Sequence, residues 1–327
     1  MVQVSSTGSL GETVRSDERV YMNFPEFVDE GNVSDFRTEV VSFLDGRESE
    51  KHLTRSVVRA VVDTDTAQEL LSDKFIFNRV EAATPIQSTD DSGTSTEHLI
   101  YIAENRQDRK LTTAAKKITV NKVRNAVNYR QNNSAETSND TSNVSNVRDI
   151  REVSDPVKLH SIWGTTFGWS LEGCKEFAEQ IKDEAGKPPA ERSIWYQGIE
   201  TLNGDLLASA MAERLDMPSR EGSTIALVES TEWSAAASFR GRGIGTLVVR
   251  SLTGNVKHDL QAIDHLVFAE CNIISGAHMV ALRAGYEVPQ VESIHGLIGQ
   301  VLFKNVRIGD GYQPENQYRN FMFTVAK

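Results

Sequence analysis

The second half of the sequence predicts an α/β fold: a mixed central sheet with helices on both faces, preceded by an N-terminal α+β region. Three observations support this prediction. The β-branched run 224–228 leads through a glycine-rich turn at 241–245 into a helical pattern. A second strand and helix follow at 265–284. Asn203-Gly204 lies between two apolar runs, which is a strong hairpin signal.

The length of 327 residues favours two domains, each large enough to bury its own core. The segment 131–146 is rich in Ser, Asn and Thr and has almost nothing to bury. Such a segment cannot offset the entropy cost of ordering itself. We therefore expect an N-terminal domain at 1–130, a polar linker or loop at 131–146, and a second domain at 147–327.

The net charge of −11 argues against a nucleic-acid-binding surface, which would be basic. One local exception is a run of Lys and Arg between 106 and 130, which could bind phosphate or an acidic partner but is more often a solvated face. No apolar run is long enough to cross a bilayer, and no signal segment is recognisable at the N-terminus. The two cysteines are too few for a disulfide framework, so we expect a cytoplasmic protein.

The elements of the N-terminal region follow from periodicity and from turn residues. We expect helices at 34–44 and 66–73, a polar loop at 86–97, and either a helix or a strand at 114–127. Strands are expected at 20–27, where Pro25 interrupts the run, and at 56–62, 74–80 and 98–103. This region resembles no family and shows no catalytic or metal-binding pattern.

In the second half, Asp155-Pro156 is a typical helix start, because Asp caps the first amides and Pro fits the first turn. An aromatic turn at 162–169 should connect this helix to another at 171–185. Strands are expected at 147–153, 193–200, 206–215, 224–236, 265–270, 297–306 and 318–325. Two further helices should follow the glycine-rich turn and end near 257 and 284.

The glycine-rich turn 238–246 carries the chemistry. Glycines tolerate positive φ and let a ligand approach the backbone. The free N–H groups of the following helical turn favour an anion, most often a phosphate. The turn lacks the Gly-Lys-Ser/Thr of a Walker motif, and its glycine spacing differs from the dinucleotide fingerprint.

The order Arg240-x-x-Gly243-x-Gly245, after a strand and before a helix, resembles the acetyl-CoA loop of the GNAT N-acetyltransferases. A second motif, with a strand at 265–270 and a helix ending at Gly285-Tyr286, resembles the other half of that family's cofactor site. The resemblance covers the C-terminal half and implies acetyl-CoA as co-substrate and no metal. The cofactor-binding residues it implies are Ser234, Ala235, Ala236, Arg240, Gly241, Arg242, Gly243, Ile244, Gly245, Thr246, Asn272 and Ser275.

N-acetyl transfer needs a group that takes the proton of the attacking amine near neutral pH. Glu229 and Glu232 lie just before the turn. Counted back from the turn, Glu229 is at the position that the general base has in the histone-type acetyltransferases of that family. The two would point to opposite faces of a regular strand, but this strand often carries a bulge in the family, so the choice stays open. The alternative is that one of the two faces solvent and the other pairs with a cation.

Other site residues follow only partly from the resemblance. Phe167 and Trp169 either wall the acceptor pocket or pack the helices onto the sheet. Many family members have a proton-donating Tyr where this chain has Ala281, and His278 is a possible substitute. Tyr286 is interpreted as a core aromatic.

The sequence therefore predicts an N-acetyltransferase that moves acetyl directly from acetyl-CoA to a primary amine, on a small molecule or a lysine side chain. The alternative is an inactive acyl-CoA-binding sensor or scaffold, which the missing Tyr favours. An enzyme acting on nucleic-acid bases is a third possibility that rests on the basic stretch alone. The N-terminal domain is expected to recognise or cover the acceptor; the oligomeric state is not predicted.

Overall fold

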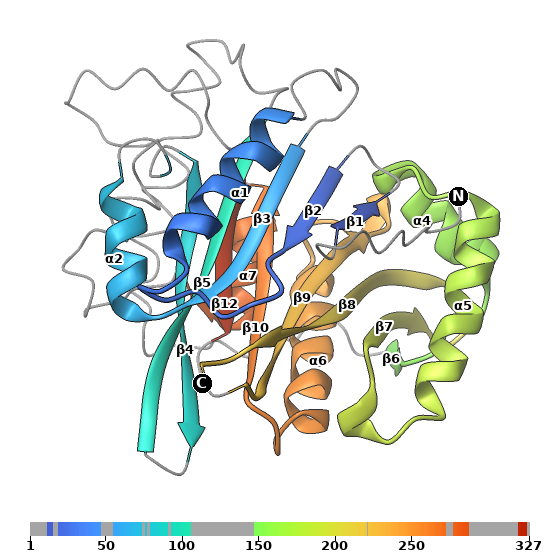
Figure 1. The fold of residues 1–327 in the computed structure, drawn as a ribbon. Coiled ribbons are helices and arrows are strands. Elements are labelled where there is room, and N and C mark those ends of the chain that lie inside the picture. The colour runs from blue at the N-terminus through green and yellow to red at the C-terminus, as the bar shows by residue number, and fades with distance from the viewer. Residues whose placement is uncertain are drawn as a thin grey trace.

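Two mixed β-sheets and their helices make up this computed structural model, which describes residues 12–15, 19–46, 55–73, 76, 79–90, 93–105, 147–220, 222–272, 277–287 and 320–325. Sheet A comes from the N-terminal region and has the strand order β1-β2-β3-β5-β4. Sheet B comes from the second half and has the order β11-β12-β10-β9-β8-β7-β6 (Figure 1).

Sheet A is built around β3 (Arg55–Val62), a run of buried β-branched residues. It pairs in parallel with β2 (Arg19–Asn23) and antiparallel with β5 (Gly93–Asn105). The parallel pair is joined through α1 (Val33–Gly46), whose Phe36, Val40 and Leu44 are fully buried, as the spacing predicts. The helix α2 (Thr64–Ser72) starts at Asp63, whose side chain accepts from the Thr66 amide. The sheet is completed by β1 (Glu12–Arg15) and β4 (Val80–Asp90).

The predicted polar loop at 86–97 is wrong. These residues belong to the long antiparallel hairpin of β4 and β5, paired from Val80–Ile102 to Asp90–Gly93. The strand expected at 74–80 is also displaced, because Ile76 and Arg79 lie in a turn and β4 begins at Val80. Threonine favours strands, and Pro85 is tolerated because β4 is an edge strand. The Ser/Thr-rich composition therefore marks an edge hairpin here and not a loop.

Sheet B is antiparallel except between its two central strands, β9 (Thr224–Ala235) and β10 (His265–Asn272). The predicted hairpin joins β7 (Ile194–Thr201) to β8 (Leu206–Pro218), and Gly204 has φ 83° in its turn. One edge is β6 (Val147–Ile150), and the other carries β12 (Asn320–Val325) and β11 (Tyr286–Glu287). The predicted mixed sheet is therefore present.

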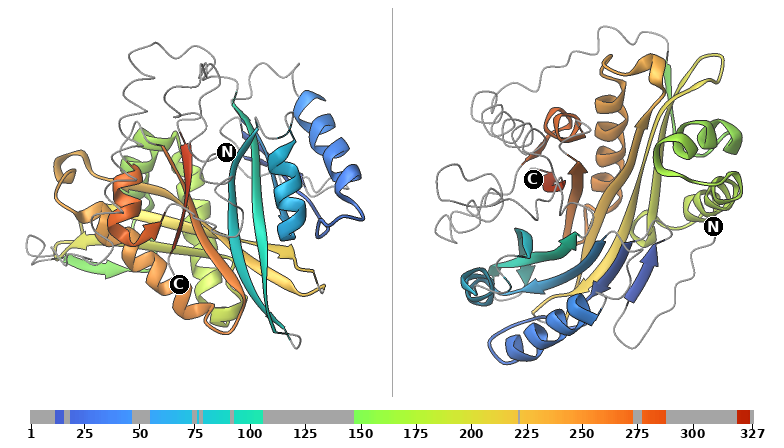
Figure 2. Two further views of the ribbon diagram at one scale, coloured as in Figure 1. Left: turned by 90° about the vertical axis from the view of Figure 1, so that its left-hand side faces the viewer. Right: turned by 90° about the horizontal axis from the view of Figure 1, so that it is seen from above.

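Helices cover both faces of sheet B, as predicted (Figure 2). On one face lie α4 (Pro156–Phe167) and α5 (Leu171–Ala185), with Asp155 and Ser170 as their N-caps. On the other face lie α6 (Ile244–Asp259), which is the crossover between β9 and β10, and α7 (Ala277–Ala284). Two short 3₁₀ turns occur at Pro189–Glu191 and Ala237–Phe239.

The aromatic turn expected at 162–169 is mostly helix, because α4 continues to Phe167 and ends at Gly168, which has φ 79°. Gly164 lies inside this helix. A Cβ there would come within 2.9 Å of His160 Nε2 and 3.2 Å of the Trp169 carbonyl oxygen. Gly164 therefore lets the chain at Trp169 pack closely against α4, and it does not form a turn.

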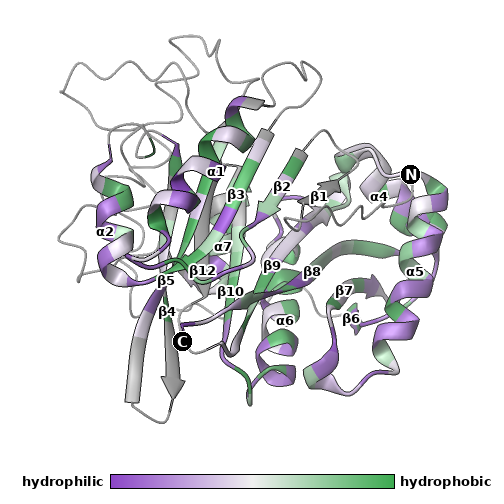
Figure 3. Cartoon of the chain, in the orientation of Figure 1, coloured by the Kyte–Doolittle hydropathy of each residue, from purple (hydrophilic) through white to green (hydrophobic). Residues whose placement is uncertain are grey.

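Sheet A packs on the face of sheet B that also carries α4 and α5, so its outer side is left to α1 and α2 (Figures 1 and 2). Buried residues of both sheets, from Tyr21 and Val57 to Leu227 and Phe268, form one continuous hydrophobic cluster. Figure 3 shows the corresponding pattern, with mainly hydrophobic strands and hydrophilic residues on the outer side of α5. A smaller cluster around Trp163 lies between sheet B and the helices α4 and α5.

Four predicted segments lie outside the described residues. They are the element at 114–127, the basic stretch, the linker 131–146 and the strand at 297–306.

Candidate functional site

The central strands of sheet B part at a defined point. Parallel pairing of β9 with β10 runs from Ala226–His265 to Glu229–Phe268. Beyond that pair β9 continues to Ala235, while β10 continues to Asn272 paired with β12. No further β9–β10 pairing occurs among the described residues. The two strands are thus no longer hydrogen-bonded to each other beyond Glu229 and Phe268, and the place where they separate is called the slot below.

The glycine turn lies where β9 ends. Gly241 and Gly243 have φ of 79° and 81°, a conformation that residues with a side chain rarely adopt. A Cβ at either position would meet no atom within 4 Å, so the space in front of both is open. At Gly245 a Cβ would lie 3.9 Å from Val280, an ordinary contact. The first two glycines are therefore required by backbone conformation.

The start of α6 faces this open space. Gly243 is its N-cap and provides no side-chain hydrogen bond, and the first backbone bond of the helix runs from the Leu247 amide to the Gly243 carbonyl oxygen. The amides of the first helical turn have no intrahelical partner in any α-helix. They include those of Ile244, Gly245 and Thr246, which the sequence predicts to bind an anion.

The two arginines of the turn are exposed. Arg240 Nε donates to the Ala235 carbonyl oxygen at 3.4 Å, and the Arg242 guanidinium lies 5.3 Å from the centre of the Phe239 ring. Both charged groups are therefore held beside the turn and can add to the positive end of the helix dipole.

The residues expected to hold the pantetheine arm have partners of their own. The Ala236 amide donates to the Leu207 carbonyl oxygen at 2.9 Å. The Ser234 hydroxyl lies 3.1 Å from that of Ser209, which also accepts from Trp163 Nε1. A pantetheine contact in this region would therefore use other backbone groups of 230–235.

Two predicted cofactor residues remain, Asn272 and Ser275. Asn272 is the last residue of β10, where it pairs with Asn320 of β12. Ser275 lies outside the described residues.

The bulge that the sequence left open is present in β9. Ser209 of β8 pairs with Ser234 and Met211 pairs with Thr231, so β9 has one extra residue at this point. Glu232 lies in the bulge with φ 53°, the one positive φ of a non-glycine residue in the described part of the chain. Trp233 Nε1 donates to Ser230 Oγ, so these two side chains share a face and the regular alternation is broken.

Glu229 forms an ion pair that sequence reasoning missed. Arg59 Nη2, from β3 of sheet A, lies 2.5 Å from Glu229 Oε2, and the two side chains are only 5% and 7% exposed. The Arg59 guanidinium also lies 4.4 Å from the centre of the Tyr21 ring and 5.8 Å from that of Phe268. The pair therefore fixes the position of Glu229 at the start of the slot.

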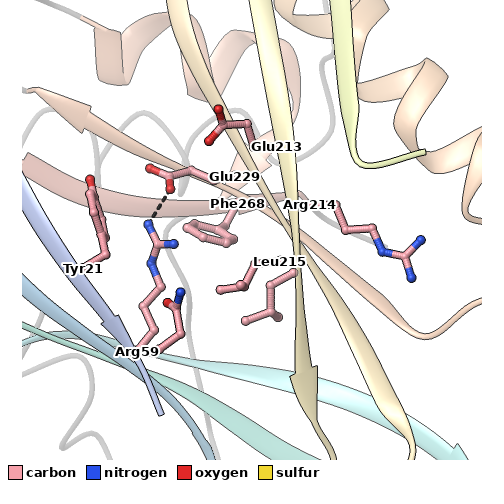
Figure 4. Close-up of a pocket in the computed structure, with 9 residues that line it drawn as sticks. Tyr21, Arg59, Glu213, Arg214, Leu215, Glu229 and Phe268 are labelled. Carbon is pink, nitrogen blue, oxygen red and sulfur yellow. Dashed lines mark hydrogen bonds and ion pairs between the residues drawn. The ribbon is translucent and has the colours of Figure 1, made fainter. Parts of the chain in front are cut away.

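A cavity of about 150 Å³ opens beside this ion pair (Figure 4). Its walls come from both sheets: Tyr21, Asn23, Arg59, Glu213, Arg214, Leu215, Leu227, Glu229 and Phe268. Glu213 faces Glu229 directly across the β8–β9 register. The sequence offered one local signal for this site, because an arginine inside an apolar strand must find a buried partner.

A comparison with solved structures finds partial likenesses at low sequence identity. A Trypanosoma brucei acetyltransferase shares 15% sequence identity with this chain at a TM-score of 0.30, and the match covers 38% of this chain and 81% of that protein. Glucosamine-6-phosphate N-acetyltransferase from Arabidopsis thaliana shares 14% sequence identity at a TM-score of 0.30, and the match covers 41% of this chain and 90% of that protein. A GNAT family N-acetyltransferase from Escherichia coli, in complex with CoA, shares 14% sequence identity at a TM-score of 0.30, and the match covers 44% of this chain and 69% of that protein.

All three are acetyltransferases. No protein-family model matches the chain, and no curated protein matches its sequence. The likeness is partial, and the function is therefore inferred from the chain's own geometry.

The two aromatic residues predicted near the acceptor pack around Trp163. Trp169 lies 4.8 Å from the Trp163 ring centre and 5.7 Å from that of Phe177, both edge-on. Phe167 lies 6.4 Å from Trp163. These contacts are those of the packing alternative, and both side chains remain partly exposed.

The position at which the resemblance implies a proton-donating Tyr lies in the core. Ala281 is fully buried on α7. Tyr286 is a core aromatic, as interpreted from the sequence, with its hydroxyl 2.9 Å from that of Thr253 and its pKa raised to about 12 by burial. Burial also raises the pKa of the Cys271 thiol, which makes it a poor nucleophile.

The described residues contain no group of three or more His, Cys, Asp or Glu side chains placed to hold a metal ion. None of their helices combines the length and apolar character that crossing a membrane requires.

Proposed function

We propose that this chain is an acyltransferase that moves the acetyl group of acetyl-CoA to a primary amine. One observation carries the proposal: the β9–β10 pairing stops at Glu229–Phe268, and β9 then ends in a turn whose left-handed glycines face open space at a helix start. An extended thioester arm fits such a slot, and a pyrophosphate fits the amides at its end.

In this proposal the amides of 241–246 bind the pyrophosphate, assisted by Arg240 and Arg242. Backbone groups of 230–235 hold the pantetheine arm, and Asn272 at the end of β10 borders it from the other side. Ser275, which lies outside the described residues, stays an expected contact from the sequence. The thioester carbon then lies near the start of the slot, beside Glu229.

The chemistry is a direct transfer. The amine nitrogen, as the free base, attacks the thioester carbon, forming the C–N bond as the C–S bond breaks. The nitrogen loses its proton to a carboxylate, and the coenzyme leaves as a thiolate that solvent protonates. Glu229 and Glu232 are the candidate bases. The Arg59 guanidinium pairs with Glu229 Oε2 and so orients that carboxylate beside the start of the slot.

A calorimetric titration of the full chain with acetyl-CoA, followed by an assay for released thiol with a panel of amines, tests the proposal. We expect binding and amine-dependent thiol release, and we expect Gly243→Val to abolish both, because its side chain would enter the space before the helix. Binding without thiol release for any amine would instead identify an acyl-CoA sensor. No binding at all would overturn the proposal.

A further inference from the structure

The cavity beside Glu229 is lined by residues of both sheets. Tyr21, Asn23 and Arg59 reach it from sheet A, and Glu213 and Glu229 reach it from sheet B. Figure 4 shows Arg214 pointing away from it, and that guanidinium donates to Asp216 and to the Ala190 carbonyl oxygen. Arg59 is therefore the cationic group that projects into this space among the lining residues.

The cavity adjoins the start of the slot. Glu229 and Phe268 are the last residues paired between β9 and β10, and both also line the cavity. A molecule in the cavity would therefore lie next to any thioester carbon held where the strands part. It would approach from the side of sheet A, which leaves the slot itself to the coenzyme.

The polar groups around the cavity favour a guest that donates hydrogen bonds and carries positive charge. Two carboxylates, Glu213 and Glu229, face each other across neighbouring strands on the side that faces Arg59. Asn23 Oδ1 is buried and accepts no hydrogen bond in the described part of the chain. Buried polar atoms normally have partners, so this oxygen indicates a missing donor.

The volume restricts the guest to a small molecule. Typical ligand pockets measure about 300–1,000 Å³, and this one has about 150 Å³. An engineered apolar cavity of about that volume takes up benzene. A guest of similar size therefore fits.

We propose that this cavity is the acceptor site and that its substrate is a short-chain diamine. One ammonium group binds Glu213 and Asn23, and the second nitrogen, as the free base, faces the slot beside Glu229. Sheet A is thereby part of the acceptor site, with Arg59 as a positioning residue that orients Glu229. The inference rests on the acetyl-transfer function proposed above.

Steady-state kinetics with acetyl-CoA and three amines tests this assignment: 1,3-diaminopropane, propylamine of similar size, and a lysine-containing peptide. We expect the diamine to have the highest kcat/KM. Losing a charge-assisted hydrogen bond should raise the KM for the diamine about 10- to 100-fold in Glu213→Gln. The KM for acetyl-CoA should stay unchanged in that variant. Asn23→Leu should raise the diamine KM in the same direction.

Glu172→Gln is the matched control, because Glu172 is an exposed carboxylate on α5 with an ion pair to Lys175. It should leave every kinetic constant unchanged. Equal turnover of propylamine and the diamine, preference for the peptide, or an unchanged diamine KM in Glu213→Gln would each overturn the acceptor assignment.

Two binding measurements separate this inference from the proposed function. If calorimetry detects no acetyl-CoA binding, the proposed function fails, and saturation-transfer NMR with 1,3-diaminopropane alone decides whether the cavity binds a diamine. If acetyl-CoA binds but the diamine is not acetylated, the acceptor assignment fails while the coenzyme site stands.

Discussion

The ion pair between Arg59 and Glu229 should couple the stability of the two sheets. Its partners come from β3 and β9, are separated by 170 positions in sequence, and are almost completely buried. Replacing Arg59 by Met keeps a flexible apolar side chain among Tyr21 and Phe268 but leaves the Glu229 carboxylate without its guanidinium. The expected result is a large loss of stability.

The magnitude follows from the burial of both charges. Removing one partner of a buried pair costs about 3–5 kcal/mol, because the remaining charge is buried without compensation. Glu229→Gln should cost a similar amount for the same reason. The double variant removes both charges, so we expect it to be more stable than the sum of the two changes predicts, with a coupling energy of about 3 kcal/mol.

Urea unfolding followed by tryptophan fluorescence measures this coupling across the sheets. All four tryptophans lie in the second half of the chain, whereas Arg59 lies in the first. Arg220→Met is the matched control, because Arg220 also reaches across to sheet A, through Asp63, but is 59% exposed. It should cost at most about 1 kcal/mol. An unchanged fluorescence midpoint in Arg59→Met, or additive losses in the double variant, would refute the reasoning.

Three further predictions concern single residues away from the ion pair. His98 is fully buried, and burial lowers its pKa to about 4. Because the same side chain takes up its proton near pH 6.5 in the unfolded chain, the free energy of unfolding should fall by about 3 kcal/mol between pH 6.5 and 4. In urea unfolding, His98→Leu should lack this pH-dependent loss of stability. Gly254 is exposed inside α6 with open space around it, so Gly254→Ala should stabilise the protein by about 0.5–1 kcal/mol. Gly243 has φ 81°, so Gly243→Ala should destabilise it by about 1 kcal/mol. Equal urea midpoints for the two variants would contradict both expectations. Burial raises the thiol pKa of Cys174 to about 11 and that of Cys271 further. A thiol reagent at pH 8 should therefore label neither cysteine until urea unfolds the chain. Fast labelling of the folded protein would be inconsistent with the packing of these two side chains.

Elements that depend on local chemistry were predictable from the sequence. The helix start at Asp155-Pro156, the hairpin at Asn203-Gly204 and the glycine turn all follow from residues adjacent in the chain, and the structure has each of them. The errors occur where composition misleads, as in the Ser/Thr-rich edge hairpin. Gly164 lies in the segment predicted as an aromatic turn, yet it packs inside the helix α4.

The parts of the candidate site that depend on pairing could not be read locally. The bulge at Glu232 is defined by the register with β8, which no single strand specifies. The contact of Arg59 with Glu229 requires the packing of two sheets, and the position of Glu213 opposite Glu229 again depends on register. The sequence therefore indicated the coenzyme side of the proposed site, whereas the proposed acceptor side could be inferred only from the fold.

Amide hydrogen exchange of the full chain, with and without saturating acetyl-CoA, tests most directly whether the coenzyme lies between β9 and β10. The account predicts slower exchange in two segments, 230–235 along the slot and 241–246 at the start of α6, with little change in the β7–β8 hairpin. Binding that protects other segments while leaving these two unchanged would contradict the account.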